Sequence, residues 1–261
     1  MLDITAISKT FHPGTPNARQ ALRQLSLHLE DGEFATILGS NGAGKSTLFG
    51  AIAGSFYTDE GRILLDGTDL TFQPEHRRSR VIGRLFQDPM RGTAPHMTIE
   101  ENLALAYLRT AKHQHAFFSR TSKADRALFR DQLARLEMGL EDRMGQPVGL
   151  LSGGQRQKIG IARALLCRAP YIIFDEATSS VDQQSEEEIW RCIDELAQTR
   201  TLVIISHRLS TIRKADCIYV LSGGKIEESG RHEVLMKKNG LYHRLVTEQQ
   251  KLEEQAEEGR A

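Results

Sequence analysis

A glycine-rich loop at residues 39–47 contains the residue types that bind the phosphates of a nucleotide. The loop reads Gly39, Ser40, Asn41, Gly42, Ala43, Gly44, Lys45, Ser46 and Thr47. Its glycines let successive backbone N–H groups point at an anion, and a following helix adds the positive end of its dipole. We expect Lys45 to reach the β- and γ-phosphates of ATP and the Ser46 hydroxyl to ligate Mg²⁺.

Two adjacent carboxylates, Asp175 and Glu176, follow the apolar run Tyr171–Phe174. Open α/β sheets bind their ligands at the carboxyl ends of such strands. A carboxylate can accept the proton of a water that it holds in line with the γ-phosphate, and we assign this role to Glu176. The alternative is that the two acids only end a strand in solvent.

A second anion-binding feature is predicted where a helix at 155–167 begins. It consists of Ser152, Gly153, Gly154 and Gln155. A serine hydroxyl, backbone N–H groups and the positive end of a helix dipole together suit a phosphate group.

The elements around the glycine-rich loop fit phosphate binding. Phe34–Leu38 is a continuous apolar run, typical of a parallel strand that is covered on both faces. It leads directly into the loop, and Lys45–Ala53 has the small and apolar residues of a buried helix. A strand, a glycine loop and a helix in this order are the context that a phosphate loop requires.

The rest of the chain reads as an α/β core interrupted by helices. Further strands are expected at 4–7, Ala21–Leu29, Tyr171–Phe174 and Thr201–Ile205, with a hairpin of Cys217–Leu221 and Lys225–Glu228. Helices are expected at Ile99–Leu108, Lys123–Met138 and Gln155–Cys167, and Ser185 with Glu188 predicts a capping box that opens another helix. The glutamate-rich tail after Lys251 is expected to fray into solvent.

Composition excludes several function classes. The 261 residues carry 34 Lys and Arg against 34 Asp and Glu, so bulk charge favours neither nucleic acid nor anionic lipid. The longest apolar runs are strand-sized, and the N-terminus lacks a signal pattern, so we expect a cytoplasmic protein. The three scattered cysteines, Cys167, Cys192 and Cys217, are expected to be buried free thiols.

Together with the phosphate loop, the pentapeptide Leu151-Ser152-Gly153-Gly154-Gln155 closely resembles the signature of ATP-binding cassette (ABC) ATPases. The resemblance implies an α/β fold: a P-loop NTPase core with a mixed sheet flanked by helices, an N-terminal antiparallel β subdomain and an inserted α-helical subdomain. It also implies a homodimer in which each ATP, with Mg²⁺, is enclosed by the phosphate loop of one subunit and the pentapeptide of the other.

The resemblance also implies roles for single residues. Asp175 would hold Mg²⁺, and His207 would contact the γ-phosphate as the switch histidine of the family. Gln87 would touch Mg²⁺ or the attacking water, and Asp182 would signal between the two sites. Phe11 lies where the family places an aromatic ring on adenine, although it could equally be a core residue.

The resemblance changes character along the chain. Up to Gln157 the sequence looks like the ATPase subunit of a bacterial importer for amino-acid-like solutes, a likeness carried by residues 86–93 and 97–103. From Lys158 it looks like an exporter ATPase domain, a likeness carried by residues 161–164, 175–182 and 206–212. A natural mosaic and a constructed chimera both fit this change. Because the membrane partner of such proteins docks near Gln87, on the importer-like side, the sequence favours import.

We therefore expect an ATPase that drives solute transport through a separate membrane permease, on the inner face of the cell membrane. A solute-binding protein is a further expected partner, and nucleic acid is not. The alternatives are an exporter ATPase domain and an ABC ATPase that acts on nucleic acid or the ribosome. The expected domains are a core with β subdomain at 1–87 and 155–240, a helical subdomain with the signature at 88–154, and a C-terminal helix and tail at 241–261.

Overall fold

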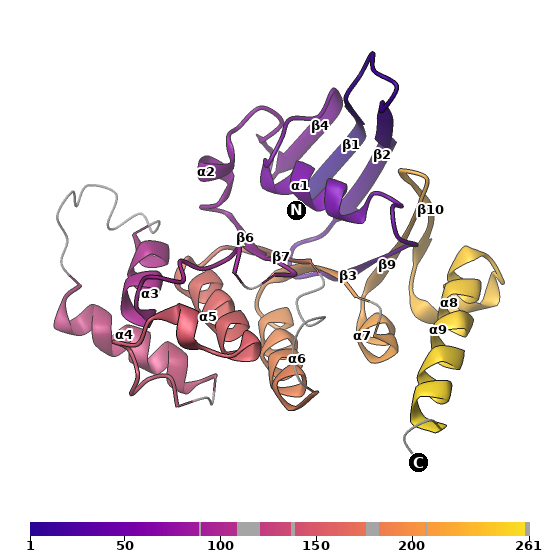
Figure 1. The fold of residues 1–261 in the computed structure, drawn as a ribbon. Helices are drawn as coiled ribbons and strands as arrows, with labels where there is room; N and C mark the ends of the chain where they lie inside the picture. The colour runs from indigo at the N-terminus through magenta and orange to yellow at the C-terminus, as the bar shows by residue number, and fades with distance from the viewer. Residues whose placement is uncertain (89, 109–120, 137–138, 176–182, 207, 259–261) are drawn as a thin grey trace. The chain divides into compact units, whose positions relative to one another are not determined.

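The computed structural model describes residues 1–88, 90–108, 121–136, 139–175, 183–206 and 208–258, and leaves the side chains of 183–185 and 252–258 undescribed. The chain forms two compact units, and Figure 1 labels helices and strands that they contain. Unit one comprises Met1–Arg78 and Thr201–Ala261, and unit two comprises Ser79–Arg200. The predicted helical subdomain, 88–154, is contained in unit two.

Unit one begins with an antiparallel sheet. Strands β1 (Leu2–Phe11), β2 (Arg19–Leu29), β4 (Glu60–Leu65) and β5 (Thr68–Asp69) are ordered β2-β1-β4-β5. The alternation predicted in β2 is confirmed, because Leu25, Leu27 and Leu29 are buried while Ser26 and His28 are exposed. One face of this sheet therefore contributes to the core of the unit.

The second set of strands in unit one surrounds β3 (Phe34–Leu38). β3 pairs in parallel with β8 (Thr201–Ile205) on one side and β9 (Cys217–Ser222) on the other, and β10 (Lys225–Gly230) pairs antiparallel with β9. Every residue of β3 and β8 is buried, as their continuous apolar sequences predict.

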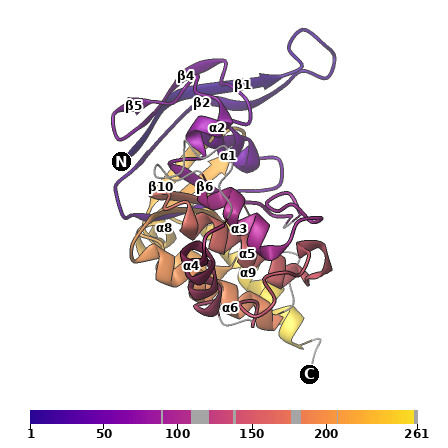
Figure 2. The same ribbon diagram turned by 90° about the vertical axis from the view of Figure 1, so that its left-hand side faces the viewer.

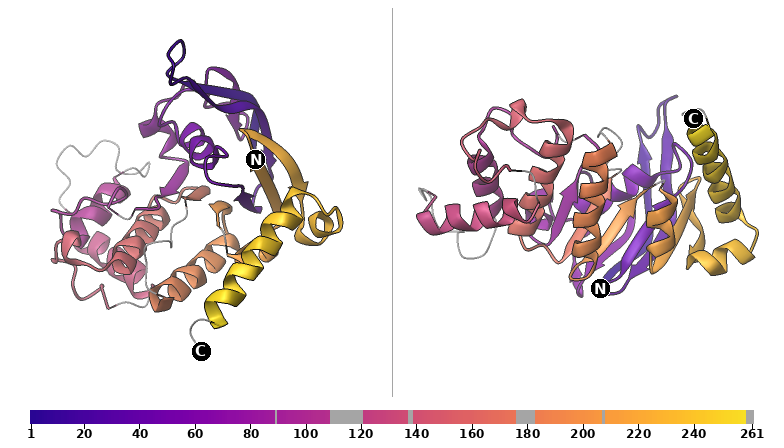
Figure 3. Two further views of the ribbon diagram at one scale, coloured as in Figure 1. Left: turned by 45° about the vertical axis from the view of Figure 1, so that its right-hand side comes forward. Right: turned by 90° about the horizontal axis from the view of Figure 1, so that it is seen from below.

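The helices of unit one follow these strands. They are α1 (Lys45–Ala53), α2 (Glu75–Arg78), α7 (Leu209–Lys214), α8 (His232–Lys237) and α9 (Leu241–Glu258). The yellow C-terminal helix α9 packs on α7, α8 and β10 (Figure 3).

Unit two pairs two parallel strands with a group of helices. β6 (Ile82–Leu85) lies beside β7 (Tyr171–Asp175), with Leu85 opposite Phe174. The helices are α3 (Ile99–Tyr107), α4 (Lys123–Ala134), a short 3-10 helix η2 (Val148–Leu150), α5 (Gly153–Leu166) and α6 (Gln183–Ala197). Helix α5 packs on α3, α4, α6 and β6, so it is the central helix of this unit (Figure 2).

Two expectations need correction. Helix α6 begins at Gln183, so Ser185 lies within its first turn and is not the N-cap. The cysteines are free, as expected, but each is half-buried rather than fully buried. Within the described ranges, no helix is both long and apolar enough to cross a bilayer.

Candidate functional site

The glycine-rich loop joins β3 to α1 in unit one, as predicted, and two of its glycines are required by close backbone contacts. Gly39 has φ 156°, and a Cβ there would lie 2.3 Å from the Leu221 carbonyl oxygen. Gly44 has φ 112°, and a Cβ there would lie 2.7 Å from the Ala21 carbonyl oxygen. Any larger residue would push the loop away from β2 and β9, so these positions fix its path.

Lys45 stabilises the turn of this loop. Its side chain is buried, with 6% of the residue exposed, and Nζ donates to the carbonyl oxygens of Gly39 at 2.6 Å and Ser40 at 3.2 Å. The ammonium group is thereby held inside the loop, on the same backbone that would surround a phosphate. A buried cation with backbone partners can exchange them for phosphate oxygens at a low cost in desolvation.

The loop is also held from outside by contacts within unit one. The Gly224 N–H donates to the Ala43 carbonyl at 3.0 Å, and Arg19 Nη2 donates to the Gly42 carbonyl at 3.0 Å. Gly44 caps α1 without a side chain, and no acidic residue lies in the first turn. The first turn of α1 therefore supplies no carboxylate that would compete with a bound anion at the positive end of the helix dipole.

The C-terminal end of α1 is held by a buried arginine that the sequence analysis missed. Arg78 is 1% exposed, and its guanidinium donates to the carbonyl oxygens of Ala51 at 2.6 Å, Ile52 at 3.0 Å, Thr71 at 3.0 Å and Gln73 at 2.9 Å. Burial lowers the pKa of this guanidinium below its usual range. A cation at the negative end of the helix dipole stabilises α1 and hence the loop that precedes it.

Asp175 ends β7 in unit two, where the sequence predicted a buried strand with a carboxylate at its end. The residue is 8% exposed, and its Oδ2 lies 3.6 Å from Nη2 of Arg84 on the neighbouring strand β6. Gln87 is exposed and follows β6 after Phe86, whose carbonyl oxygen accepts a hydrogen bond from Gln157 Nε2 at 3.4 Å. Unit two therefore brings two predicted metal ligands to the carboxyl ends of two adjacent strands.

The signature pentapeptide forms the start of α5. Ser152 is the N-cap: its Oγ accepts from the Gln155 N–H at 3.2 Å, and Gln155 Oε1 accepts from the Ser152 N–H at 3.2 Å. Ser152 is exposed, and the first turn contains no acidic residue. An exposed hydroxyl at the positive end of a helix is suited to an anion that arrives from outside the chain.

A second buried cation, also missed from the sequence, connects α5 to α6 in unit two. Lys158 is fully buried, and its Nζ donates to the Leu136 carbonyl at 2.6 Å and to Glu188 Oε2 at 2.8 Å. No sequence signal reveals this contact, because Lys158 and its two partners come from three separate segments. The contacts of Arg78 and Arg84 could not be predicted for the same reason, because their partners lie in other elements.

Several predicted site residues are outside the described part of the chain: Glu176, Asp182 and His207. Phe11 is half-buried at the end of β1, where its ring meets Phe56 edge-on at 5.3 Å between centroids. Lys9 Nζ lies 5.9 Å from the Phe11 centroid. These contacts fit both predicted roles of Phe11, the ring on adenine and the core residue.

Each unit offers ligand types that fit a magnesium nucleotide. In unit one, Ser46 at the start of α1 offers a hydroxyl. In unit two, Asp175 at the end of β7 and Gln87 after β6 offer a carboxylate and an amide, and such oxygen atoms are the ligands that Mg²⁺ prefers. The backbone at Gly39 and Gly44 has no room for a Cβ, as expected of a loop that wraps around phosphate groups. Ser46 belongs to unit one and the other two residues to unit two.

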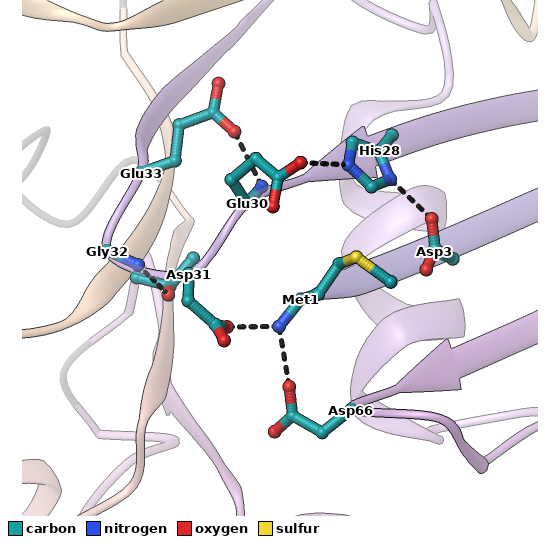
Figure 4. Close-up of polar contacts among 9 residues, drawn as sticks. Met1, Asp3, His28, Glu30, Asp31, Gly32, Glu33 and Asp66 are labelled. Carbon is teal, nitrogen blue, oxygen red and sulfur yellow. Dashed lines mark hydrogen bonds and ion pairs between the residues drawn. The ribbon is translucent and has the colours of Figure 1, made fainter.

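A polar cluster braces the turn that leads into β3 in unit one (Figure 4). The His28 ring forms hydrogen bonds with the carboxylates of Glu30, at 3.0 Å, and Asp3. These hydrogen bonds raise the pKa of His28, and the bond to Glu30 has the larger effect. The Gly32 N–H donates to Thr201 Oγ1 at 2.9 Å, which joins the turn to the start of β8. The cluster supports the strand that carries the phosphate loop.

Comparisons with known proteins agree with this geometry. The sequence profile of the ABC transporter family matches residues 22–179. The chain is 38% identical over 252 residues to the ATP-dependent lipid A-core flippase of Alcanivorax borkumensis, covering 94% of this chain and 40% of the flippase. It is 39% identical over 230 residues to the cyclolysin secretion/processing ATP-binding protein CyaB of Bordetella pertussis, covering 88% of this chain and 31% of that protein. The chain thus spans two fifths or less of the length of these curated relatives.

Two solved structures share the fold. A dimeric ATP-binding cassette in a post-hydrolysis state with ADP and Pi bound has a TM-score of 0.74 at 27% identity, covering 88% of this chain and 98% of that one. A bacterial Atm1-family ABC exporter with ATP bound has a TM-score of 0.75 at 29% identity, and the match covers 95% of this chain and 41% of the exporter chain. The predicted α/β cassette fold, with its mixed sheet and flanking helices, is confirmed.

The expectation of import is not supported. A flippase, a secretion protein and an exporter are among the similar proteins, so the alternative of an exporter ATPase is favoured. The importer-like motifs at 86–93 and 97–103 do not decide the direction of transport, because importers and exporters share the nucleotide chemistry. The chain belongs to the ABC transporter family, as an ATP-hydrolysing cassette.

Proposed function

We propose that this chain is the ATPase cassette of an ABC exporter or flippase, and that it drives a membrane permease domain from the membrane surface. The observation that carries the proposal is the 38% identity to a lipid A-core flippase over 94% of the chain. The similarity to exporters argues against a solute-binding protein as a partner. The balanced charge also gives no support to a role on nucleic acid or the ribosome.

In this proposal two cassettes pair head to tail around two ATP molecules. Lys45 and the N–H groups of the loop bind the phosphates of one nucleotide, and Ser152 to Gln155 of the other subunit complete the site. The exposed N-cap hydroxyl of Ser152 and the lack of an acid in the first turn of α5 support this arrangement. The dimeric cassette among the similar structures supports it as well.

Within each composite site, this chain's residues position water and neutralise charge. Ser46, Asp175 and Gln87 would hold Mg²⁺, which when bound neutralises charge on the phosphates. Glu176 accepts the proton of the attacking water, and His207 contacts the γ-phosphate. Asp182 relays the state of one site to the other, and Phe11 stacks on adenine. Phosphoryl transfer then depends mainly on positioning, which a closed dimer provides.

The oligomeric state of Glu176→Gln tests the pairing. With Mg-ATP this variant should elute as a dimer on size exclusion and turn over no ATP, whereas with ADP it should remain a monomer. Phosphoryl transfer stalls without the base, so the ATP that joins the subunits is retained. A monomer under both conditions, or steady hydrolysis, would contradict the proposed pairing or the assignment of the base.

The direction of transport requires a second test. The cassette and its permease domain would be reconstituted into liposomes, and movement of a fluorescent lipid would be followed. An exporter or flippase moves the lipid out of the leaflet that faces the cassettes when ATP is present. Transport toward the cassettes that requires an added solute-binding protein would contradict the proposal.

A further inference from the structure

Arg84 makes a contact with Asp175 that none of the predicted site roles includes. Arg84 lies on β6 opposite Ile173 of β7, two residues before the end of that strand. Its Nη2 is 3.6 Å from Asp175 Oδ2, and the two side chains are only 15% and 12% exposed. The ion pair thus joins two adjacent strands and is largely buried from solvent.

A ring holds the guanidinium in this position. The Cζ atom of Arg84 lies 4.5 Å from the centroid of the Phe86 ring, within the range of a cation–π contact. Phe86 directly precedes Gln87, the second predicted metal ligand of unit two. Arg84 therefore contacts both the carboxylate of Asp175 and the residue that precedes Gln87.

The charge of Arg84 has two opposite effects on Asp175. It stabilises the buried carboxylate when no other cation is near, because an unpaired buried charge is costly. It also opposes a divalent cation on the same carboxylate, since arginine keeps its charge and like charges repel strongly where solvent screening is weak.

We propose that Arg84 is a positioning residue that holds Asp175 through their ion pair and lowers the affinity of this carboxylate for a divalent cation. The inference rests on the proposed role of Asp175 in holding Mg²⁺. Its consequence is that the cation binds well only together with the negative charge of a nucleoside triphosphate. The site would then load the metal and the nucleotide as one unit rather than the metal first.

Binding of Mn²⁺ tests this inference without relying on hydrolysis. The free Mn²⁺ signal in electron paramagnetic resonance gives the Kd of Mn²⁺ in the presence of a non-hydrolysable ATP analogue. We expect Arg84→Gln to lower that Kd by about tenfold, because a unit charge beside the cation is removed. Arg84→Lys keeps the charge and should stay near the original Kd.

A matched control is Arg135→Gln, which removes an arginine from an exposed ion pair with Asp131 in the same unit. Its Kd for Mn²⁺ should not change. A second route is Phe86→Leu, which keeps Arg84 but removes the ring that holds it, and should lower the Kd by about threefold. This variant decides the matter if Arg84→Gln does not fold.

An unchanged or higher Kd in a folded Arg84→Gln, or failing that in Phe86→Leu, would overturn the inference. Asp175→Asn separates this result from a failure of the proposed function. If Asp175→Asn leaves the Kd unchanged, Asp175 does not hold the metal, and both the role proposed for Asp175 and the role inferred for Arg84 are wrong. If Asp175→Asn raises the Kd while Arg84→Gln has no effect, only the role of Arg84 is wrong.

Discussion

Lys158 Nζ lies 2.8 Å from Glu188 Oε2, which ties α5, the helix of the signature pentapeptide, to α6. The same ammonium group donates to the Leu136 carbonyl just after α4. Three segments of unit two therefore meet at one buried cation. Because α5 carries Ser152 at its start, this contact helps to hold in place the helix whose start we assign to the partner's nucleotide.

Lys158→Met should lower the free energy of unfolding by about 3 kcal/mol, since it removes the cation beside Glu188 and the charged donor to the Leu136 carbonyl. Glu188→Gln keeps a hydrogen-bond acceptor and should cost about 1 kcal/mol. Urea unfolding of the isolated cassette measures both. Equal stability of Lys158→Met and the original chain would show that the pair contributes nothing.

Arg78→Met should also destabilise the chain by about 3 kcal/mol, because four carbonyl oxygens lose a charged donor at once. The adjacent residue Arg77 is exposed, so Arg77→Met is a matched control with little expected effect. The measurement is again urea unfolding. If the two variants lose the same stability, the buried contacts of Arg78 are not what holds α1.

Lys45→Ala should weaken ATP binding by at least about tenfold, since a charge-assisted contact to the phosphates is lost. Lys225, an exposed lysine of β10 in the same unit, offers the control Lys225→Ala. Isothermal titration with ATP gives both affinities. Unchanged ATP affinity in Lys45→Ala would show that the Lys45 ammonium group does not contact the phosphates.

His28 predicts a small dependence of stability on pH. Hydrogen bonds to Glu30 and Asp3 raise its pKa in the folded chain, so its contribution is fully present below the unfolded pKa of about 6.5 and is lost as pH rises through the folded pKa. The Tm difference between the original chain and His28→Gln should therefore shrink from pH 6 toward pH 8. His96→Gln, at another exposed histidine, is the control. A difference that grows with pH would contradict this sign.

The sequence was most informative where local pattern and tertiary burial agree. β3, α1 and β8 have the bounds that their apolar runs predict, because a strand buried on both faces permits few polar residues. The serine that was expected to cap α6 did not do so, since a capping signal is local and the two preceding glutamines are themselves good helix formers. Helix ends are decided partly by packing that no single pattern reports.

The buried cations could not be predicted in the same way. Arg78, Arg84 and Lys158 each bond to atoms from other elements, so their roles depend on tertiary contacts rather than on spacing. The expectation of import is not supported for a related reason, because nucleotide-binding motifs are common to importers and exporters and do not report the direction of transport. The motifs to which we assign phosphate binding, in contrast, are local in sequence, so the sequence alone reveals them.

Mixing two inactive variants tests the shared site most directly. Lys45→Ala damages the phosphate loop and Ser152→Arg damages the signature, so neither homodimer should hydrolyse ATP. In a mixed dimer, the intact loop of Ser152→Arg would meet the intact signature of Lys45→Ala and form one complete site. An equal mixture should then recover up to about a quarter of the original activity, since half of the dimers are mixed and each has one of two sites. No recovery in a mixture shown to form mixed dimers would contradict the account.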